Sequence, residues 1–119
     1  SFEFENAFVA RAESLFTGKP SRKAIQAIED TILVAINSEK LFLLFDSHPD
    51  LERLFRKIIE RSYVNTVNRI ESLQFNTAEE RYNTLLKDNP DTLKRVPLKY
   101  IASYLGITQV SLSRIRGVK

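Results

Sequence analysis

The residues best suited to chemistry lie near the C-terminus, in the segment ITQVSLSRIR. After Thr108, its polar side chains are those of Gln109, Ser111, Ser113, Arg114 and Arg116. Arginine can bond guanine O6 and N7, glutamine can bond adenine N6 and N7, and serine can hold a phosphate oxygen. The segment therefore predicts a surface that reads bases in a DNA groove.

Two short amphipathic segments must position these residues. We expect a helix over 97–104, a turn centred on Gly106 and a helix over 108–116 capped by Thr108. A small residue, Ala102, suits the place where two helices cross closely, and glycine tolerates the positive φ of a tight turn. The residues expected in the shared core are Ile101, Leu105, Ile107, Leu112 and Ile115. The pattern indicates a helix-turn-helix with its second helix in a major groove, and a purely structural helical hairpin is the alternative.

Charge along the chain is unevenly distributed. Residues 94–119 carry six Lys or Arg and no acidic side chain, whereas the whole chain carries +3, so residues 1–93 carry −3. A cationic end of this kind attracts a polyanion. We expect Lys99 and Tyr104 to reach the sugar-phosphate backbone beside the second helix.

Several classes of function are not expected. The chain has no cysteine, which excludes disulfides, thiolate metal sites and thiol nucleophiles. The acidic pairs at 29–30 and 79–80 are better explained by a turn and a helix start, so we expect no enzyme, metal site or cofactor. The longest apolar run, LFLLF, is far below the roughly 20 residues of a membrane-spanning helix. We expect a soluble cytoplasmic protein.

The N-terminal third has a composition typical of strands. The stretch AIQAIEDTILVAI is rich in β-branched residues and interrupted by a turn signal. We predict strands near 2–5, 23–28 and 31–36, and leave 7–16 open, with a helical part as one alternative. These strands are too few to close a barrel, so they predict part of a larger β-structure.

Helical periodicity begins after Asn37. Ser38 is expected to cap a helix over 39–47, and Pro49 to open a helix of about 25 residues, almost 40 Å long. Such length favours a helix partner in a second copy over packing on its own domain. The residues expected to form this dimer interface are Leu51, Phe55, Ile58, Ile59, Tyr63, Val67, Ile70 and Leu73.

A second set of helix signals precedes the hairpin. Thr77 and Glu80 have the spacing of a capping box, which predicts a helix over 78–88. Asn89 and Pro90 end that helix, and a short turn or helix is expected over 91–94.

The segments RVPLKYIASYLGITQVSLSRIR and AEERYNTLLKDNPD resemble the Crp/Fnr family of bacterial transcriptional regulators, in particular its short members from the Bacteroidetes. The resemblance implies an α+β fold with a cyclic-nucleotide-binding-like β-roll, a dimerisation helix and a helix-turn-helix. It implies the C-terminal part of an effector β-roll with a short helix over 1–48. A dimerisation helix follows over 49–75, and a DNA-binding domain without a β-wing over 76–119. On this basis the chain begins partway through the β-roll, which agrees with the absent initiator Met.

The resemblance also assigns roles to residues of the second hairpin helix. Gln109, Val110 and Arg114 occupy positions with which the family reads bases. Val110 replaces a frequent Glu, so a thymine methyl contact becomes possible. The complete DNA-binding set that we predict is Gln109, Val110, Ser111, Ser113, Arg114, Arg116, Lys99 and Thr108.

The family's effector motif is poorly matched. Nucleotide-binding members use a Gly-Glu pair and an Arg-Ser or Arg-Thr pair, whereas this chain has no Gly-Glu and reads Ser21-Arg22 in reversed order. Cyclic AMP binding of the usual family type is therefore not expected. Ser21 and Arg22 are a weak effector-site prediction, and solvated turn residues are the alternative.

Together these features predict a sequence-specific transcriptional regulator that binds a palindromic site on double-stranded DNA as a homodimer through helix 49–75. RNA polymerase is a further partner if the protein activates transcription. The alternative is a protein-interaction or oligomerisation module whose helical hairpin binds a partner protein. Strong salt dependence would distinguish DNA binding from an apolar protein contact.

Overall fold

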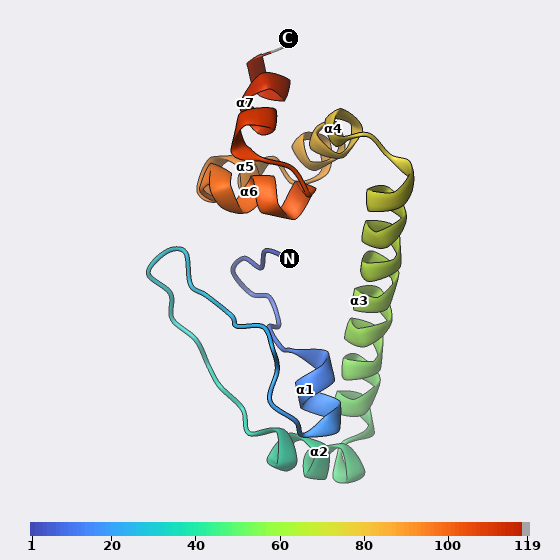
Figure 1. Ribbon diagram of the computed structural model, residues 1–119. Helices are drawn as coiled ribbons and strands as arrows, with labels where there is room; N and C mark the ends of the chain where they lie inside the picture. The colour runs from blue at the N-terminus through green and yellow to red at the C-terminus, as the bar shows by residue number, and fades with distance from the viewer. Residues whose placement is uncertain (118–119) are drawn as a thin grey trace. The chain divides into compact units, whose positions relative to one another are not determined.

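The computed structural model describes residues 1–117, and these residues form seven α-helices (Figure 1). The helices are α1 Ala12–Thr17, α2 Ser38–Ser47, α3 Pro49–Phe75, α4 Ala78–Asp88, α5 Pro90–Arg95, α6 Leu98–Leu105 and α7 Gln109–Gly117. The chain divides into an N-terminal unit, Glu3–Ile59, and a C-terminal unit, which combines Ser1–Phe2 with the residues from Glu60 onward. In the described part of the chain, no helix combines the length and apolar character needed to cross a membrane.

The predicted α+β fold with a β-roll is wrong. Residues 2–5, 23–28 and 31–36 form no strand, and no sheet occurs among residues 1–117. The apolar side chains of Ile32 and Val34 are 98% and 92% exposed. Strand preference depends on packing against neighbouring strands, and a strand also needs a partner for its backbone groups. The composition of these segments is typical of strands, but no described segment of the chain pairs with them.

Phenylalanines hold the N-terminal unit together. Phe55 of α3 packs edge-on against Phe8, with ring centroids 4.7 Å apart, and lies 5.2 Å from Phe45 of α2. Phe42 of α2 extends this cluster to Phe16 of α1, at 6.2 Å. Segment 7–16, for which no single structure was predicted, is therefore partly helical, because α1 begins at Ala12.

Local signals define the ends of α2 and α3. Asn37, and not Ser38 as predicted, caps α2, because the Asn37 carboxamide oxygen accepts a hydrogen bond from the Lys40 backbone N–H at 3.1 Å. Pro49 opens α3 as predicted, since its missing N–H costs nothing in the first turn of a helix. The long helix is confirmed, with 27 residues.

The C-terminal unit has a compact helical core. The predicted capping box is present, because Glu80 N–H donates to the Thr77 hydroxyl at 3.2 Å and Thr77 N–H donates to the Glu80 carboxylate at 3.2 Å. A short helix, α5, occupies the region expected as a turn or helix. The buried residues of this core are Tyr82, Leu85, Val96, Ile101, Ala102, Leu105 and Leu112.

Candidate nucleic-acid interface

The helical hairpin predicted from the sequence is present as α6, a short turn and α7. Gly106 has φ 72° and ends α6 in the left-handed conformation. Gly106 N–H donates to the carbonyl of Ser103 at 3.1 Å, and Ile107 N–H donates to that of Ala102 at 3.0 Å. Glycine is favoured here because other residues pay a steric cost at positive φ. Pro97 lies just before α6 and not inside its first turn.

Thr108 fixes the start of α7. Its hydroxyl accepts a hydrogen bond from Ser111 N–H at 3.1 Å and donates one to the Ser111 hydroxyl at 3.0 Å. The predicted cap is therefore present. Because the two hydroxyls are hydrogen-bonded to each other, Thr108 and Ser111 stabilise the first turn of α7 without a ligand.

One side of α7 is buried and the other is exposed. Leu112 is 0% exposed, and Ile115 packs partly buried against the same core. Gln109, Ser113 and Arg114 are exposed, and Val110 is 62% exposed. At about 100° per residue these four side chains lie across the side opposite the core. Gln109 and Arg114 can hydrogen-bond to bases, Ser113 provides a hydroxyl group and Val110 provides methyl groups.

Arg116 belongs to a different flank of α7. Arg114 and Arg116 are separated by about 160° around the helix. Arg116 and Ser113 line a groove of about 510 Å³ together with residues of α4 and α5. The other lining residues are Tyr82, Leu86, Pro90, Leu93, Lys94 and Gly117. Arg114 and Arg116 are therefore suited to different parts of a ligand.

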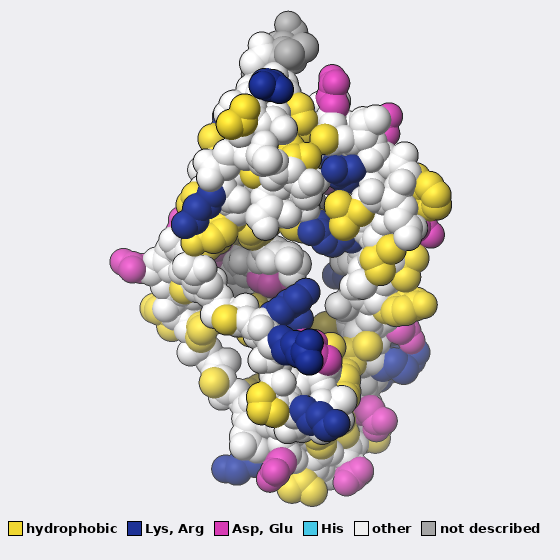
Figure 2. Space-filling model, viewed as in Figure 1, with side chains coloured by type: hydrophobic (Ala, Val, Ile, Leu, Met, Phe, Trp, Pro, Cys, Tyr) yellow, Lys and Arg dark blue, Asp and Glu magenta, His cyan; other side chains and the backbone are white. Residues whose placement is uncertain are grey.

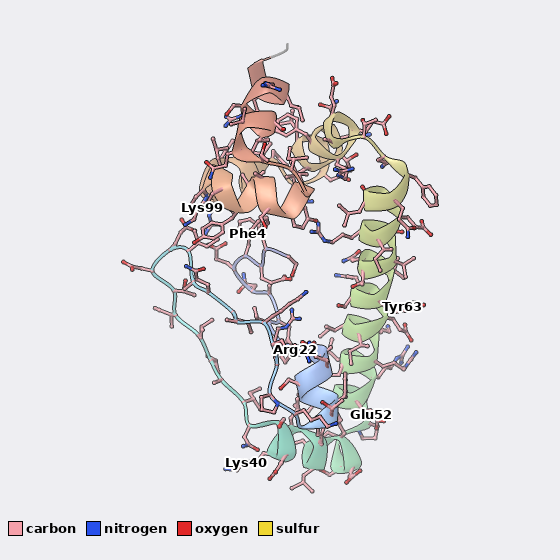
Figure 3. The ribbon with its side chains drawn as sticks, viewed as in Figure 1. Phe4, Arg22, Lys40, Glu52, Tyr63 and Lys99 are labelled. Atoms are coloured by element: carbon pink, nitrogen blue, oxygen red, sulfur yellow. The ribbon has the colours of Figure 1, made fainter. Side chains whose placement is uncertain are left out.

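The hairpin of α6 and α7 carries cations and no acidic side chain, and Lys94 and Arg95 lie in the last turn of α5. Figure 2 shows basic side chains over α6 and α7, while acidic ones lie over α4. Lys99 projects from the start of α6 (Figure 3), and its ammonium group lies 4.8 Å from the Tyr100 ring centroid. Lys119, the last residue of the basic segment, is outside the described residues. The exposed cations Lys94, Lys99, Arg114 and Arg116 give this surface the charge that a phosphate backbone attracts.

Two arginines that we did not predict to have a role donate hydrogen bonds to carbonyl groups at the end of α6. Arg69 of α3 donates to the Tyr104 carbonyl at 2.8 Å, and Arg81 of α4 donates twice to the Leu105 carbonyl. The Arg69 guanidinium also lies 3.8 Å from the Tyr104 ring centroid. No short motif marks such long-range contacts. The sequence shows that arginines occur near the ends of two helices, but it does not show which carbonyl groups they bind.

Tyr104, which we expected to reach the DNA sugar-phosphate backbone, has its ring packed within the C-terminal unit. Its ring is partly buried between Arg69 and Phe2, whose ring centroid lies 5.2 Å away. The ring is therefore part of the packing of the C-terminal unit.

The apolar residues of α3 differ in accessibility. Ile59, Tyr63 and Ile70 are exposed and lie within about 40° of one another around the helix, with Tyr63 pointing outward (Figure 3). Leu51, Ile58 and Val67 are half-buried, and Leu73 is exposed. Phe55 is buried against its own unit, so it is less available to a second copy than the exposed residues are.

The weak effector-site prediction lies beside an acid. The Ser21 hydroxyl donates to the Glu13 carboxylate at 2.9 Å, and Arg11 pairs with the same carboxylate at 3.0 Å. A backbone hydrogen bond at Glu13, then the bonds from Ser21 and Arg11, lower the pKa of Glu13. A carboxylate that stays charged repels an anion, which weakens the case for an effector phosphate at Ser21 and Arg22.

No cluster of metal-ligating side chains occurs within the described residues. Comparison of the chain with protein-family models, with characterised proteins and with solved structures gives no match. The membership of the Crp/Fnr family that the sequence suggests thus stays a prediction.

Proposed function

We propose that this protein is a sequence-specific DNA-binding transcriptional regulator that acts as a dimer. The observation that carries the proposal is the α6–Gly106–α7 hairpin, whose second helix is buried through Leu112 and exposes Gln109, Val110, Ser113 and Arg114. A short helix supported on one side and polar on the other is the element that helix-turn-helix proteins insert into the major groove.

Each exposed side chain has a distinct expected role. Arg114 donates two hydrogen bonds to one guanine, and Gln109 bonds an adenine. Val110 contacts a thymine methyl group, and Ser113 bonds a phosphate or a base edge. Lys99 and Arg116 neutralise phosphates on the flanks of the groove, since they lie away from the centre of the exposed side of α7.

The exposed apolar face of α3 supports dimerisation. Ile59, Tyr63 and Ile70 provide adjacent apolar side chains on one side of a 27-residue helix. Two copies joined there would place two recognition helices on successive major grooves about 34 Å apart. The expected ligand is a palindromic site on double-stranded DNA, and the proposed location is the cytoplasm. RNA polymerase is a further proposed partner if the protein activates transcription.

A protein-interaction module is the second candidate. The groove beside Arg116 favours it, because its lining includes the apolar side chains of Tyr82, Leu86 and Leu93. The salt dependence of the binding affinity distinguishes the two functions. DNA binding releases counterions, so its affinity falls steeply with salt concentration, whereas the affinity of an apolar contact changes little.

The test is a selection of random duplexes by the full chain, followed by titration of the winning sequence at several salt concentrations. We expect a palindromic consensus and a steep salt dependence. Arg114→Ala should lose about 1–3 kcal/mol on that sequence and relax the preference at one base pair. Arg61→Ala removes one exposed cation from α3 and is the matched control. Failure to enrich any duplex with a folded dimer would contradict the proposal.

A further inference from the structure

The end of α6 needs hydrogen-bond donors from outside the helix. The last carbonyls of an α-helix have no partner within it. The two bonds of the Gly106 turn use the carbonyls of Ala102 and Ser103. The carbonyls of Tyr104 and Leu105 are left, and these are the two that Arg69 and Arg81 bind. The turn of the hairpin is thus held by two guanidinium groups.

Arg69 holds Tyr104 at two places. Its Nη2 donates to the backbone carbonyl at 2.8 Å, and its guanidinium carbon lies 3.8 Å from the ring centroid of the same residue. A planar guanidinium can make both contacts at once, whereas a lysine ammonium lacks the fork and the flat face. Because both groups are partly buried, water competes less for these contacts. Arg69 therefore fixes α3 to the residue two positions before Gly106.

Arg81 supports the same turn from α4. Its Nε and Nη2 donate to the Leu105 carbonyl at 3.0 and 2.9 Å, and its Nη1 donates to the Asn76 carbonyl between α3 and α4. Leu73 adds a packing contact, since a Cβ on Gly106 would lie 3.4 Å from its Cδ2. The end of α3 and the turn before α7 are thus connected by polar and apolar contacts.

The position of Arg69 on α3 gives these contacts a consequence for DNA binding. Arg69 lies about 80–120° around the helix from Ile59, Tyr63 and Ile70, so the exposed apolar face and Arg69 point in different directions. One side of α3 is available to a second copy, and the other holds the turn that leads into α7. If two copies pair through this face, the contacts of Arg69 connect the dimer helix to the turn that directs α7.

We propose that Arg69 is a positioning residue that determines which half-site spacing the dimer accepts, with Arg81 as its support. This inference rests on the proposed function. A recognition helix fixed to the dimer helix fits one spacing, whereas a loosened one tolerates neighbouring spacings. Loss of the charged hydrogen bond and the ring contact should reduce the preference for the best spacing by about tenfold or more.

The experiment uses the full chain and a series of palindromic duplexes whose half-site separation changes by single base pairs, together with one isolated half-site. Arg69→Ala should bind the isolated half-site like the unchanged protein, with the same base preferences, but should lose its discrimination between spacings. Arg69→Lys should resemble Arg69→Ala, because charge alone does not restore the two contacts. Arg61→Ala, which removes the same charge from an exposed position on α3, should keep the original discrimination.

Two further measurements keep the outcomes distinct. Thermal unfolding of each variant shows whether the C-terminal unit is intact. If Arg69→Ala unfolds, Tyr104→Leu tests the same contact by removing the ring while leaving the carbonyl. Unchanged spacing discrimination in a folded Arg69 or Tyr104 variant would overturn the inference. If the unchanged protein binds no duplex, the proposed function itself fails.

Discussion

Replacement of Leu112 by alanine tests which side of α7 is buried. Leu112 is 0% exposed in the core between α6 and α7. The substitution removes three carbon groups, which is about 2.4 kcal/mol at about 0.8 kcal/mol for each buried group. Incomplete collapse of the surrounding core adds a cavity term, so we expect a loss of about 3–4 kcal/mol in the free energy of unfolding.

The matched control lies on the same helix. Val110 is 62% exposed, so Val110→Ala removes little buried surface and exchanges a β-branched residue for a better helix former. We expect its effect on the free energy of unfolding to stay within about 0.5 kcal/mol.

Tyrosine fluorescence during urea unfolding is the suitable assay. The chain has no Trp, and its four Tyr are Tyr63, Tyr82, Tyr100 and Tyr104, which all belong to the C-terminal unit. The signal therefore reports this unit alone. Protein concentration must be kept constant, because dimerisation would add to the apparent stability. A loss below about 1 kcal/mol for Leu112→Ala, or an equal loss for Val110→Ala, would refute the assignment of the buried side.

Two further substitutions test local features of the C-terminal unit. Gly106→Ala should destabilise it by about 1–2 kcal/mol, because alanine is strained at φ 72°. Gly18→Ala, at φ 70° in the other unit, should leave the tyrosine transition unchanged, and an unaffected Gly106→Ala protein would contradict the strain argument. Thr77→Ala should cost about 1 kcal/mol in the same urea assay, because it leaves Glu80 N–H without its capping hydroxyl. Thr77→Ser should keep most of that stability, and equal losses for the two variants would argue against the cap.

Most of the helices could be predicted from the sequence because their signals are local. The capping box at Thr77, the proline that opens α3 and the glycine that ends α6 each act within a few residues. The hairpin core was also predictable, since Ile101 and Leu105 in α6, and Leu112 and Ile115 in α7, recur at helical spacing.

Apart from the cap of α2, which is Asn37 and not Ser38, the errors concern features that depend on distant partners. The β-branched run 24–36 was predicted to form strands, but strands require a partner chain segment that composition does not reveal. The contacts of Arg69 and Arg81 escaped prediction for the same reason, because they join residues 35 and 24 positions apart. Long-range contacts follow from the packed arrangement of helices and not from any short motif.

These long-range contacts also show how much of the chain supports α7 and the turn before it. A helical hairpin alone would leave the carbonyls of Tyr104 and Leu105 without their guanidinium donors, so these carbonyls would be bound only by water. It would also lose Tyr82 and Leu85, which α4 contributes to the core. The part of the chain that presents α7 therefore extends back through α4 to Arg69 on α3. Because Arg69 lies inside the helix proposed to dimerise, a change in that helix at Arg69 would be transmitted directly to the turn that precedes α7.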